Sequence, residues 1–117
     1  MRIAIVVAGV LLLSGCAPHT ASTSADDSDK YTQTWATSYS ETTCSDWVNK
    51  MTEHQKFVAA ADILTSARDK IDGGTGVAPD DLIRRFESDI TTGCVEPTVT
   101  LTDAFYVIYN SDSTYKP

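Results

Sequence analysis

The chain has 117 residues, of which 42% are hydrophobic, and its nine basic and sixteen acidic side chains give a formal net charge of −7. A nucleic-acid interface needs clustered Lys and Arg, so this acidic balance excludes a nucleic-acid partner from our expectations. It also disfavours electrostatic attachment to anionic lipid and indicates a well-solvated surface.

The N-terminus predicts export and lipidation. An apolar run at residues 3–13 follows Arg2, and its eleven residues are too few to span a bilayer, which takes about 20. The run leads into the sequence Leu-Ser-Gly-Cys, ending at Cys16, which is typical of a bacterial lipoprotein signal peptide. We expect cleavage after residue 15 and diacylation of Cys16, which would anchor the chain by its lipid to the extracytoplasmic side of a cell membrane. The alternative is an ordinary secretory signal with a chance cysteine at its end.

Residues 16–40 are predicted to be a lipidated, flexible tether. Ten of the 24 residues at 17–40 are Ser or Thr, and aliphatic side chains are almost absent, so little apolar area can offset the entropy of ordering. As a coil, such a segment spans about 25–30 Å. Tyr31, Trp35 and Tyr39 are unusual in a linker. They form a short binding motif or, in the preferred interpretation, the last of them packs on the domain edge.

The folded domain is predicted at residues 41–117, with a disulfide. Once Cys16 carries lipid, Cys44 and Cys94 have only each other as partners in an oxidising compartment. The bond closes a loop of about 50 residues, which stabilises a domain of this size by about 4 kcal/mol. A metal site is not predicted, because one cysteine pair with His54 is no zinc-binding set.

The apolar spacing predicts an all-α, four-helix domain. The expected helices cover residues 44–51, 53–70, 79–92 and 101–110. Thr43 is expected to cap the first helix, and Thr52 with Gln55 has the spacing of a capping box before the second. Pro79 is expected as the first residue of the third helix.

Two polar segments that follow predicted helices are expected to be a turn and a frayed end. The run at 72–76 contains three glycines but lacks both the Lys-Ser/Thr end of a phosphate loop and the distal Glu of a calcium loop. It is therefore interpreted as a turn that ends the second helix. The polar tail at 110–117 is expected to fray.

The run at 43–48, with the sequence TCSDWV, resembles the opening Cys-x-Asp-aromatic-aliphatic motif of the HdeA/HdeB type of small periplasmic acid-stress protein. The resemblance covers residues 43–109 and implies a compact helical domain with one disulfide across about fifty residues. It also implies an ATP-independent holdase chaperone, in which low pH loosens a folded dimer and uncovers apolar surface, so a homodimer is compatible with it. The family is soluble in the periplasm, whereas this chain carries a lipidation signal.

Two protein-binding hypotheses follow. In the holdase hypothesis, the client-binding side chains are apolar ones that also qualify as core: Trp47, Val48, Phe57 and Phe86. In the alternative, the chain is a prophage-type superinfection-exclusion lipoprotein that binds an envelope or phage protein. Its recognition surface would then be formed by tyrosines expected at the surface: Tyr106, Tyr109 and Tyr115.

An enzyme is not predicted. His54 lies beside Glu53 and one helix after Asp46, but no nucleophile is placed to complete a catalytic set. Ser45 is interpreted as a helix-start residue. We therefore expect no catalytic residues and no cofactor.

Overall fold

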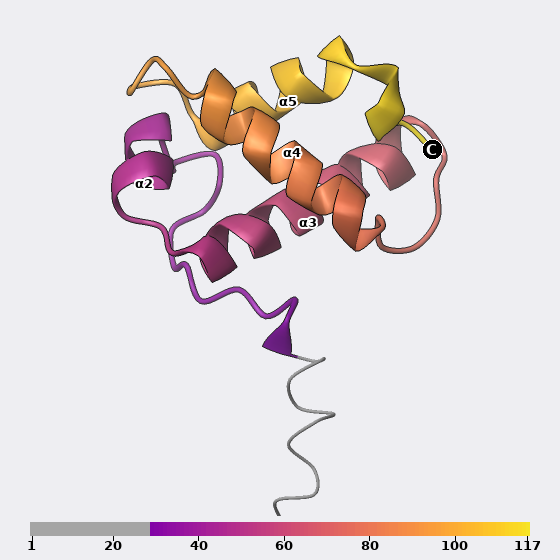
Figure 1. The fold of residues 1–117 in the computed structure, drawn as a ribbon, viewed down its shortest axis with the longest axis horizontal. Coiled ribbons are helices and arrows are strands. Elements are labelled where there is room, and N and C mark those ends of the chain that lie inside the picture. The colour runs from indigo at the N-terminus through magenta and orange to yellow at the C-terminus, as the bar shows by residue number, and fades with distance from the viewer. Residues whose placement is uncertain (1–28) are drawn as a thin grey trace, which may run out of the picture.

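The computed structural model describes residues 29–117, so the predicted signal peptide, Cys16 and the first part of the tether lie outside the described residues. The described part folds into four α-helices and a short 3-10 helix: α2 (Cys44–Asn49), α3 (Glu53–Ile71), α4 (Asp80–Gly93), α5 (Leu101–Ser111) and η2 (Ser113–Tyr115). In Figure 1, α4 lies across α3, and α3 and α5 run in the same direction. The predicted small, disulfide-linked all-α domain is confirmed.

The helix starts follow the predicted capping residues. The Thr52 hydroxyl accepts from the Gln55 amide at 3.2 Å, and the Gln55 side chain accepts from the Thr52 amide at 2.9 Å. Thr43 forms the same reciprocal pair with Asp46 at the start of α2. Two details at the helix ends differ most from prediction: α2 ends at Asn49 rather than 51, and Pro79 is the N-cap of α4 rather than its first residue. The other three helices each end one residue later than predicted.

Aromatic rings from three helices and η2 form the centre of the core. Phe86 of α4 stacks on Phe105 of α5 with ring centroids 5.5 Å apart, and Tyr115 meets Phe86 edge-on at 4.9 Å. Trp47 of α2 packs edge-on against Phe105 at 5.6 Å. Three consecutive buried alanines of α3, at 59–61, allow the neighbouring segments to pack closely against it.

The glycine-rich turn behaves as predicted. Gly73 and Gly76 have φ of 75° and 72°, a left-handed conformation that side chains other than glycine rarely adopt. The Gly74 amide donates to the Arg68 carbonyl at 2.8 Å, which satisfies one of the last carbonyl groups of α3. The turn therefore ends α3 and redirects the chain toward α4.

The C-terminal tail does not fray, so that prediction is wrong. Tyr115 is fully buried in η2, and its hydroxyl donates to the Asp89 carboxylate. The Arg68 guanidinium donates to the Tyr115 carbonyl at 2.9 Å and fixes the backbone there. A single aromatic anchor in a polar segment has no periodic pattern, and this is why the sequence reading missed it.

Replacing Tyr115 by Phe is expected to lower the free energy of unfolding by about 1–2 kcal/mol. The ring keeps its packing against Phe86, but the partly buried Asp89 carboxylate loses a hydrogen-bond donor. Urea unfolding of the whole chain measures the change. The matched control is Tyr106→Phe, because Tyr106 is 63% exposed, and it should change stability by less than about 0.5 kcal/mol. Equal effects of the two substitutions would contradict the structural role of the Tyr115 hydroxyl.

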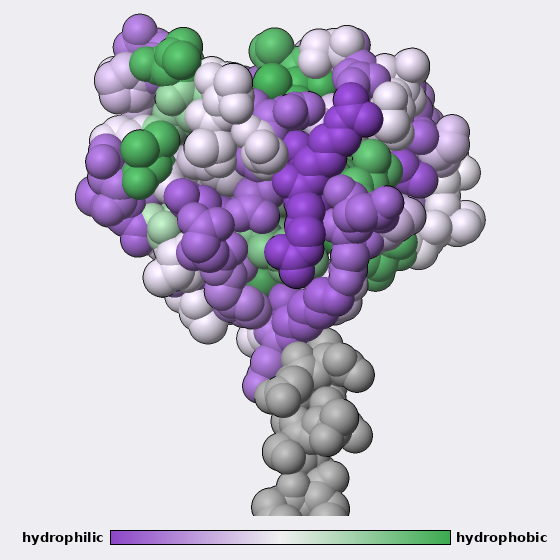
Figure 2. Space-filling model, in the orientation of Figure 1, coloured by the Kyte–Doolittle hydropathy of each residue, from purple (hydrophilic) through white to green (hydrophobic). Residues whose placement is uncertain are grey.

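The surface in this orientation is mostly hydrophilic where α4 faces the viewer, and hydrophobic residues appear as small separate patches (Figure 2). Among the large hydrophobic side chains of residues 29–117, the most exposed is Val95, which is 83% exposed in the connection between α4 and α5, and Val48 on α2 is 52% exposed. Scattered apolar side chains of this kind are normal on a folded domain. Within residues 29–117, no helix has the length and apolar character that a membrane span requires.

Candidate functional site

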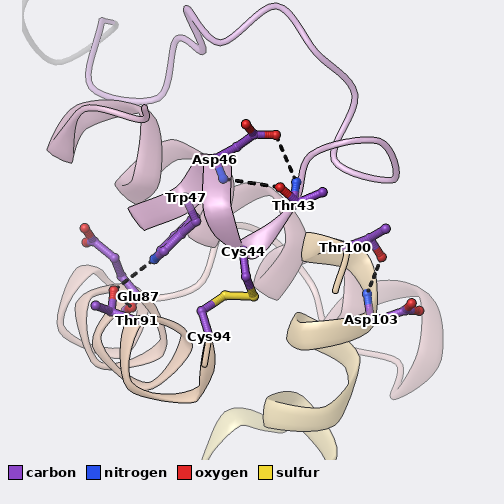
Figure 3. Close-up of a disulfide and its surroundings, with 9 residues drawn as sticks. All are labelled: Thr43, Cys44, Asp46, Trp47, Glu87, Thr91, Cys94, Thr100 and Asp103. Atoms are coloured by element: carbon purple, nitrogen blue, oxygen red, sulfur yellow. Dashed lines mark hydrogen bonds between the residues drawn. A yellow bond between two sulfur atoms is a disulfide. The ribbon is translucent and has the colours of Figure 1, made fainter. Parts of the chain in front are cut away.

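The disulfide joins the first residue of α2 to the residue that follows α4 (Figure 3). Cys44 and Cys94 are bonded, with 5.2 Å between their Cα atoms and a sequence separation of 50, so the predicted pairing is confirmed. Beside the bond, the Cys44 amide donates to the Val99 carbonyl and the Leu101 amide donates to the Thr42 carbonyl, both at 2.8 Å. This corner therefore ties α2 to the chain on both sides of the α4–α5 connection.

Trp47 links this corner to α4. Its indole Nε1 donates to the Thr91 hydroxyl at 3.0 Å, so the only polar group of a fully buried side chain is satisfied (Figure 3). The Thr91 hydroxyl in turn donates to the Glu87 carbonyl at 2.9 Å. Trp47 is thus part of the framework that the disulfide stabilises, in agreement with the interpretation of this residue as core.

Residues 29–43, which we call the N-terminal strap, lie against the helical body. The Trp35 indole donates to the buried Thr42 hydroxyl at 2.8 Å, and the Tyr31 ring packs on Phe57 with centroids 6.0 Å apart. Trp35 and Tyr39 are both partly buried against the core. The structure therefore differs from the predicted tether over residues 29–40, because aromatic side chains supply the burial that the aliphatic count did not show.

Polar contacts fasten the strap to α3 and α4. Lys30 forms an ion pair with Asp80, the first residue of α4, and the Tyr31 hydroxyl donates to the same carboxylate at 2.7 Å. The Gln33 amide donates to the Gln55 carbonyl of α3 at 3.1 Å. Since two of these contacts involve the Asp80 carboxylate, the attachment of the strap depends on the charge of that group and therefore on pH.

Four tyrosines share one arrangement, in which the hydroxyl donates to an aspartate distant in sequence. The pairs are Tyr31–Asp80, Tyr39–Asp62, Tyr109–Asp72 and Tyr115–Asp89. Each pair joins a strap, helix or tail residue to a different helix or to its end, over 23 to 49 positions. Burial first, and the hydrogen bond to Asp72 second, raise the pKa of Tyr109 to about 12, so this hydroxyl stays a donor.

The predicted binding residues divide into two groups. Trp47, Phe57 and Phe86 are buried, and only Val48 of the four holdase candidates is exposed. Among the three tyrosines expected at the surface, Tyr106 is exposed, but Tyr109 and Tyr115 are buried and bonded to aspartates, so that expectation is wrong for these two. Tyr109 lies four residues after Phe105 on the buried face of α5, a spacing that indicated burial.

Several aspartates are held in their charged form by the fold. The Lys30 ammonium and then the Tyr31 hydroxyl hold the pKa of Asp80 below its usual value. Hydrogen bonds from the Tyr109 hydroxyl and Lys116 lower the pKa of Asp72. Each such group contributes stability that is present above its unfolded pKa of about 3.8 and is lost as pH falls through its lower folded pKa.

Glu87 of α4 titrates in the opposite sense. Burial raises its pKa to about 7, and the neighbouring carboxyl of Glu53 adds to the rise by favouring the protonated form. Because its folded pKa is higher than its unfolded pKa, its stabilising contribution is complete below about pH 4.5 and is lost as pH rises toward 7. The domain thus combines groups that favour neutral pH with one that favours mild acid.

Replacing Glu87 by Gln is expected to remove the loss of stability that the wild type shows between about pH 4.5 and 7. The amide cannot ionise, so it has no charge to repel Glu53, and the variant should unfold at a higher urea concentration than the wild type at pH 7. Urea midpoints from pH 3 to 8 measure the profile. As a control, Glu96→Gln changes an exposed glutamate of the α4–α5 connection and should leave the dependence of the urea midpoint on pH unchanged. A Glu87→Gln profile parallel to that of the wild type would contradict the assignment.

An apolar groove of about 450 Å³ lies between α3 and α5, and we call it the α3–α5 groove. Its floor and walls include Ile63 and Ala67 of α3, Phe105 and Tyr106 of α5, and Tyr39 of the strap. The Tyr39 hydroxyl donates to Asp62 at 2.7 Å near the start of the groove, whereas Lys70 and Ile71 lie at the end of α3. No pattern in the sequence indicated this groove, because its residues come from three separate segments.

His54 has a structural contact. One ring nitrogen, Nε2, lies 2.9 Å from the Thr32 carbonyl, so the ring holds the strap. Among residues 29–117, no group of three His, Cys, Asp or Glu side chains has the arrangement of a metal site.

The described fold defines a small all-α domain with one disulfide. Comparison of the chain with known proteins finds no matching family model, no matching curated protein and no matching solved structure. The resemblance of residues 43–109 to the HdeA/HdeB type therefore stays a prediction, and function must be argued from the chain itself.

Proposed function

We propose that this chain is a lipid-anchored, non-enzymatic lipoprotein of the cell envelope whose helical domain binds unfolding proteins in acid, as a holdase. The observation that carries the proposal is the attachment of the strap through carboxylates. Asp80 binds Lys30 and Tyr31, and its pKa is lowered by both contacts. Protonation of such groups in strong acid removes the attraction that keeps the strap in place.

Release of the strap would uncover apolar surface. Phe57 is 6% exposed in the folded state and lies under the Tyr31 ring, and Trp35 and Tyr39 pack on the core near it. The disulfide keeps α2 and the end of α4 joined, so the opened domain retains a connected set of apolar side chains around Trp47 and Phe86. Such a surface suits association with unfolded chains, which also expose apolar groups.

Suppression of client aggregation tests the holdase proposal. An acid-labile enzyme that aggregates at pH 3 is mixed with the whole chain, and light scattering is followed at pH 3 and pH 7. We expect suppression at pH 3 only, with an onset below about pH 4, because the pKa of the Asp80 carboxyl that holds the strap lies below its usual value of about 3.8. No suppression at pH 3 would remove the proposal.

A matched pair of variants connects that activity to the strap. Asp80→Asn weakens the contacts with Lys30 and Tyr31, so the onset of suppression should move toward neutral pH. Asp81→Asn is the control, because Asp81 is an exposed neighbour in the same first turn of α4. An equal shift in both variants would indicate a general effect of charge at the α4 N-terminus.

A superinfection-exclusion lipoprotein is the second candidate, and the exposed face of α5 favours it. Tyr106 and Val107 are each 63% exposed, side by side on a helix of the folded domain, where a phage or envelope protein could be recognised at neutral pH. Expression of the chain in a phage-sensitive host should block phage DNA entry, and Tyr106→Ala should restore it. Unchanged infection across a broad panel of phages would count heavily against this candidate.

A further inference from the structure

We propose that the α3–α5 groove binds the acyl chain of a free fatty acid, with the carboxylate at Lys70. The groove has a volume of about 450 Å³, which lies within the usual range for small-molecule sites of about 300–1,000 Å³. Its middle is formed by Ile63, Ala67 and Phe105, so a ligand there meets mainly carbon. The site goes beyond the proposed holdase function, because it exists in the folded domain at neutral pH.

Two of the tyrosine hydroxyl groups in the lining already donate to aspartates. The Tyr39 hydroxyl donates to Asp62, and the Tyr109 hydroxyl donates to Asp72 outside the groove. An extended peptide would bring backbone N–H and C=O groups that need partners, and this apolar lining does not supply them. An acyl chain has no such groups, so it matches the lining better.

Charge selects the head group of the ligand. Lys70 is exposed at the end of the groove, and no acidic side chain among residues 29–117 forms an ion pair with it. At the other end, the Asp62 carboxylate is occupied by Tyr39 and repels a second anion. The carboxylate of a fatty acid is therefore expected at Lys70, with the chain directed toward Tyr39.

The distance between the two ends sets the length of chain that is covered. Asp62 and Lys70 are eight residues apart on α3, which corresponds to about 12 Å along the helix. The acyl chain is covered by Ile63 and Ala67 over this length, and the rest of it leaves the groove beyond Tyr39. Because the groove is open on one side, each covered methylene is expected to change affinity about twofold, about half the free energy of full burial.

Photolabelling tests the site with the whole chain in nanodiscs of zwitterionic phospholipid at pH 7.4. The probe is a long-chain fatty acid with a diazirine in its tail, and labelled positions are mapped by mass spectrometry. We expect saturable labelling in residues 62–71 and 102–109, with competition by the unlabelled acid but not by its methyl ester. Once the competitor is shorter than the length that the groove covers, each further loss of two carbons should weaken competition about fourfold.

Variants separate the head-group contact from the apolar contact. Lys70→Gln should weaken labelling about three- to tenfold, whereas Lys50→Gln on the distant α2 end should have no effect. Ala67→Phe should fill the groove and abolish labelling, with circular dichroism as the check on folding. If Ala67→Phe does not fold, Lys70→Gln and competition by the methyl ester still test whether the groove recognises a fatty-acid carboxylate.

Three results would overturn the proposal. Competition by the methyl ester as strong as by the acid would show that no anion is recognised. Labelling spread equally over exposed apolar residues such as Val48 and Val95 would show non-specific adsorption. Saturable binding of an amphipathic peptide without any fatty-acid labelling would assign the groove to a protein partner. Since every measurement is made at pH 7.4, each result is independent of the holdase test.

Discussion

Breaking the Cys44–Cys94 bond is expected to lower the free energy of unfolding by about 4 kcal/mol. The bond closes a loop of 50 positions, and polymer theory gives this loss of loop-closure entropy in the unfolded chain. Small domains have total stabilities of about 5–15 kcal/mol, so the loss is a large share. The double substitution Cys44→Ser/Cys94→Ser in the whole chain, followed by urea unfolding at pH 7 with tryptophan fluorescence, measures it.

Reduction of the unsubstituted chain provides the control for this prediction. It breaks the same bond without changing a side chain, so both samples should unfold at the same low urea concentration. Agreement between them shows that the linkage itself stabilises the domain, rather than a contact of either sulfur. A reduced sample as stable as the oxidised one would contradict the expected role of the bond.

Replacing Phe86 by Ala is expected to lower the free energy of unfolding by about 3–5 kcal/mol. The ring is fully buried between Phe105 and Tyr115, so truncation leaves a cavity among three elements that the rest of the core cannot fill. Thermal or urea unfolding of the whole chain measures the loss. The result distinguishes a core role for this predicted binding residue from a surface role.

Two further variants sharpen that distinction. Phe86→Leu keeps most of the apolar volume and should cost less than Phe86→Ala. Val48→Ala changes a predicted binding residue that is 52% exposed, so its effect should stay below about 0.5 kcal/mol. A small loss for Phe86→Ala would mean that the ring is not part of the stable core. In that case, the described packing would have to be revised.

The elements that repeat with a fixed spacing could be predicted from the sequence. The apolar stripes gave helices whose ends lie within two residues of the observed ones, because each helix buries one face. The threonine caps followed from their spacing to Asp46 and Gln55. The disulfide followed from the number of cysteines and the expected compartment.

Contacts between segments far apart in the chain could not be predicted in the same way. Tyr115 meets Asp89 across 26 positions, and Tyr31 meets Asp80 across 49, with no periodic pattern in either case. The strap was expected to be flexible because composition counts aliphatic residues, whereas the packing depends on where a few rings and hydroxyl groups reach. The α3–α5 groove was missed for the same reason, since it exists only after three segments have assembled.

The position of Cys44 directly after the strap has a mechanical consequence. A pull on the chain from its N-terminal side loads the contacts of Lys30, Tyr31 and Gln33 before it reaches the covalent link at Cys44. The strap should therefore peel away first and lengthen the connection by at most about 50 Å over its fifteen residues. The disulfide prevents residues 44–94 from being extended under the same force. A pull on the N-terminal side can therefore detach the strap without stretching the chain between the two cysteines.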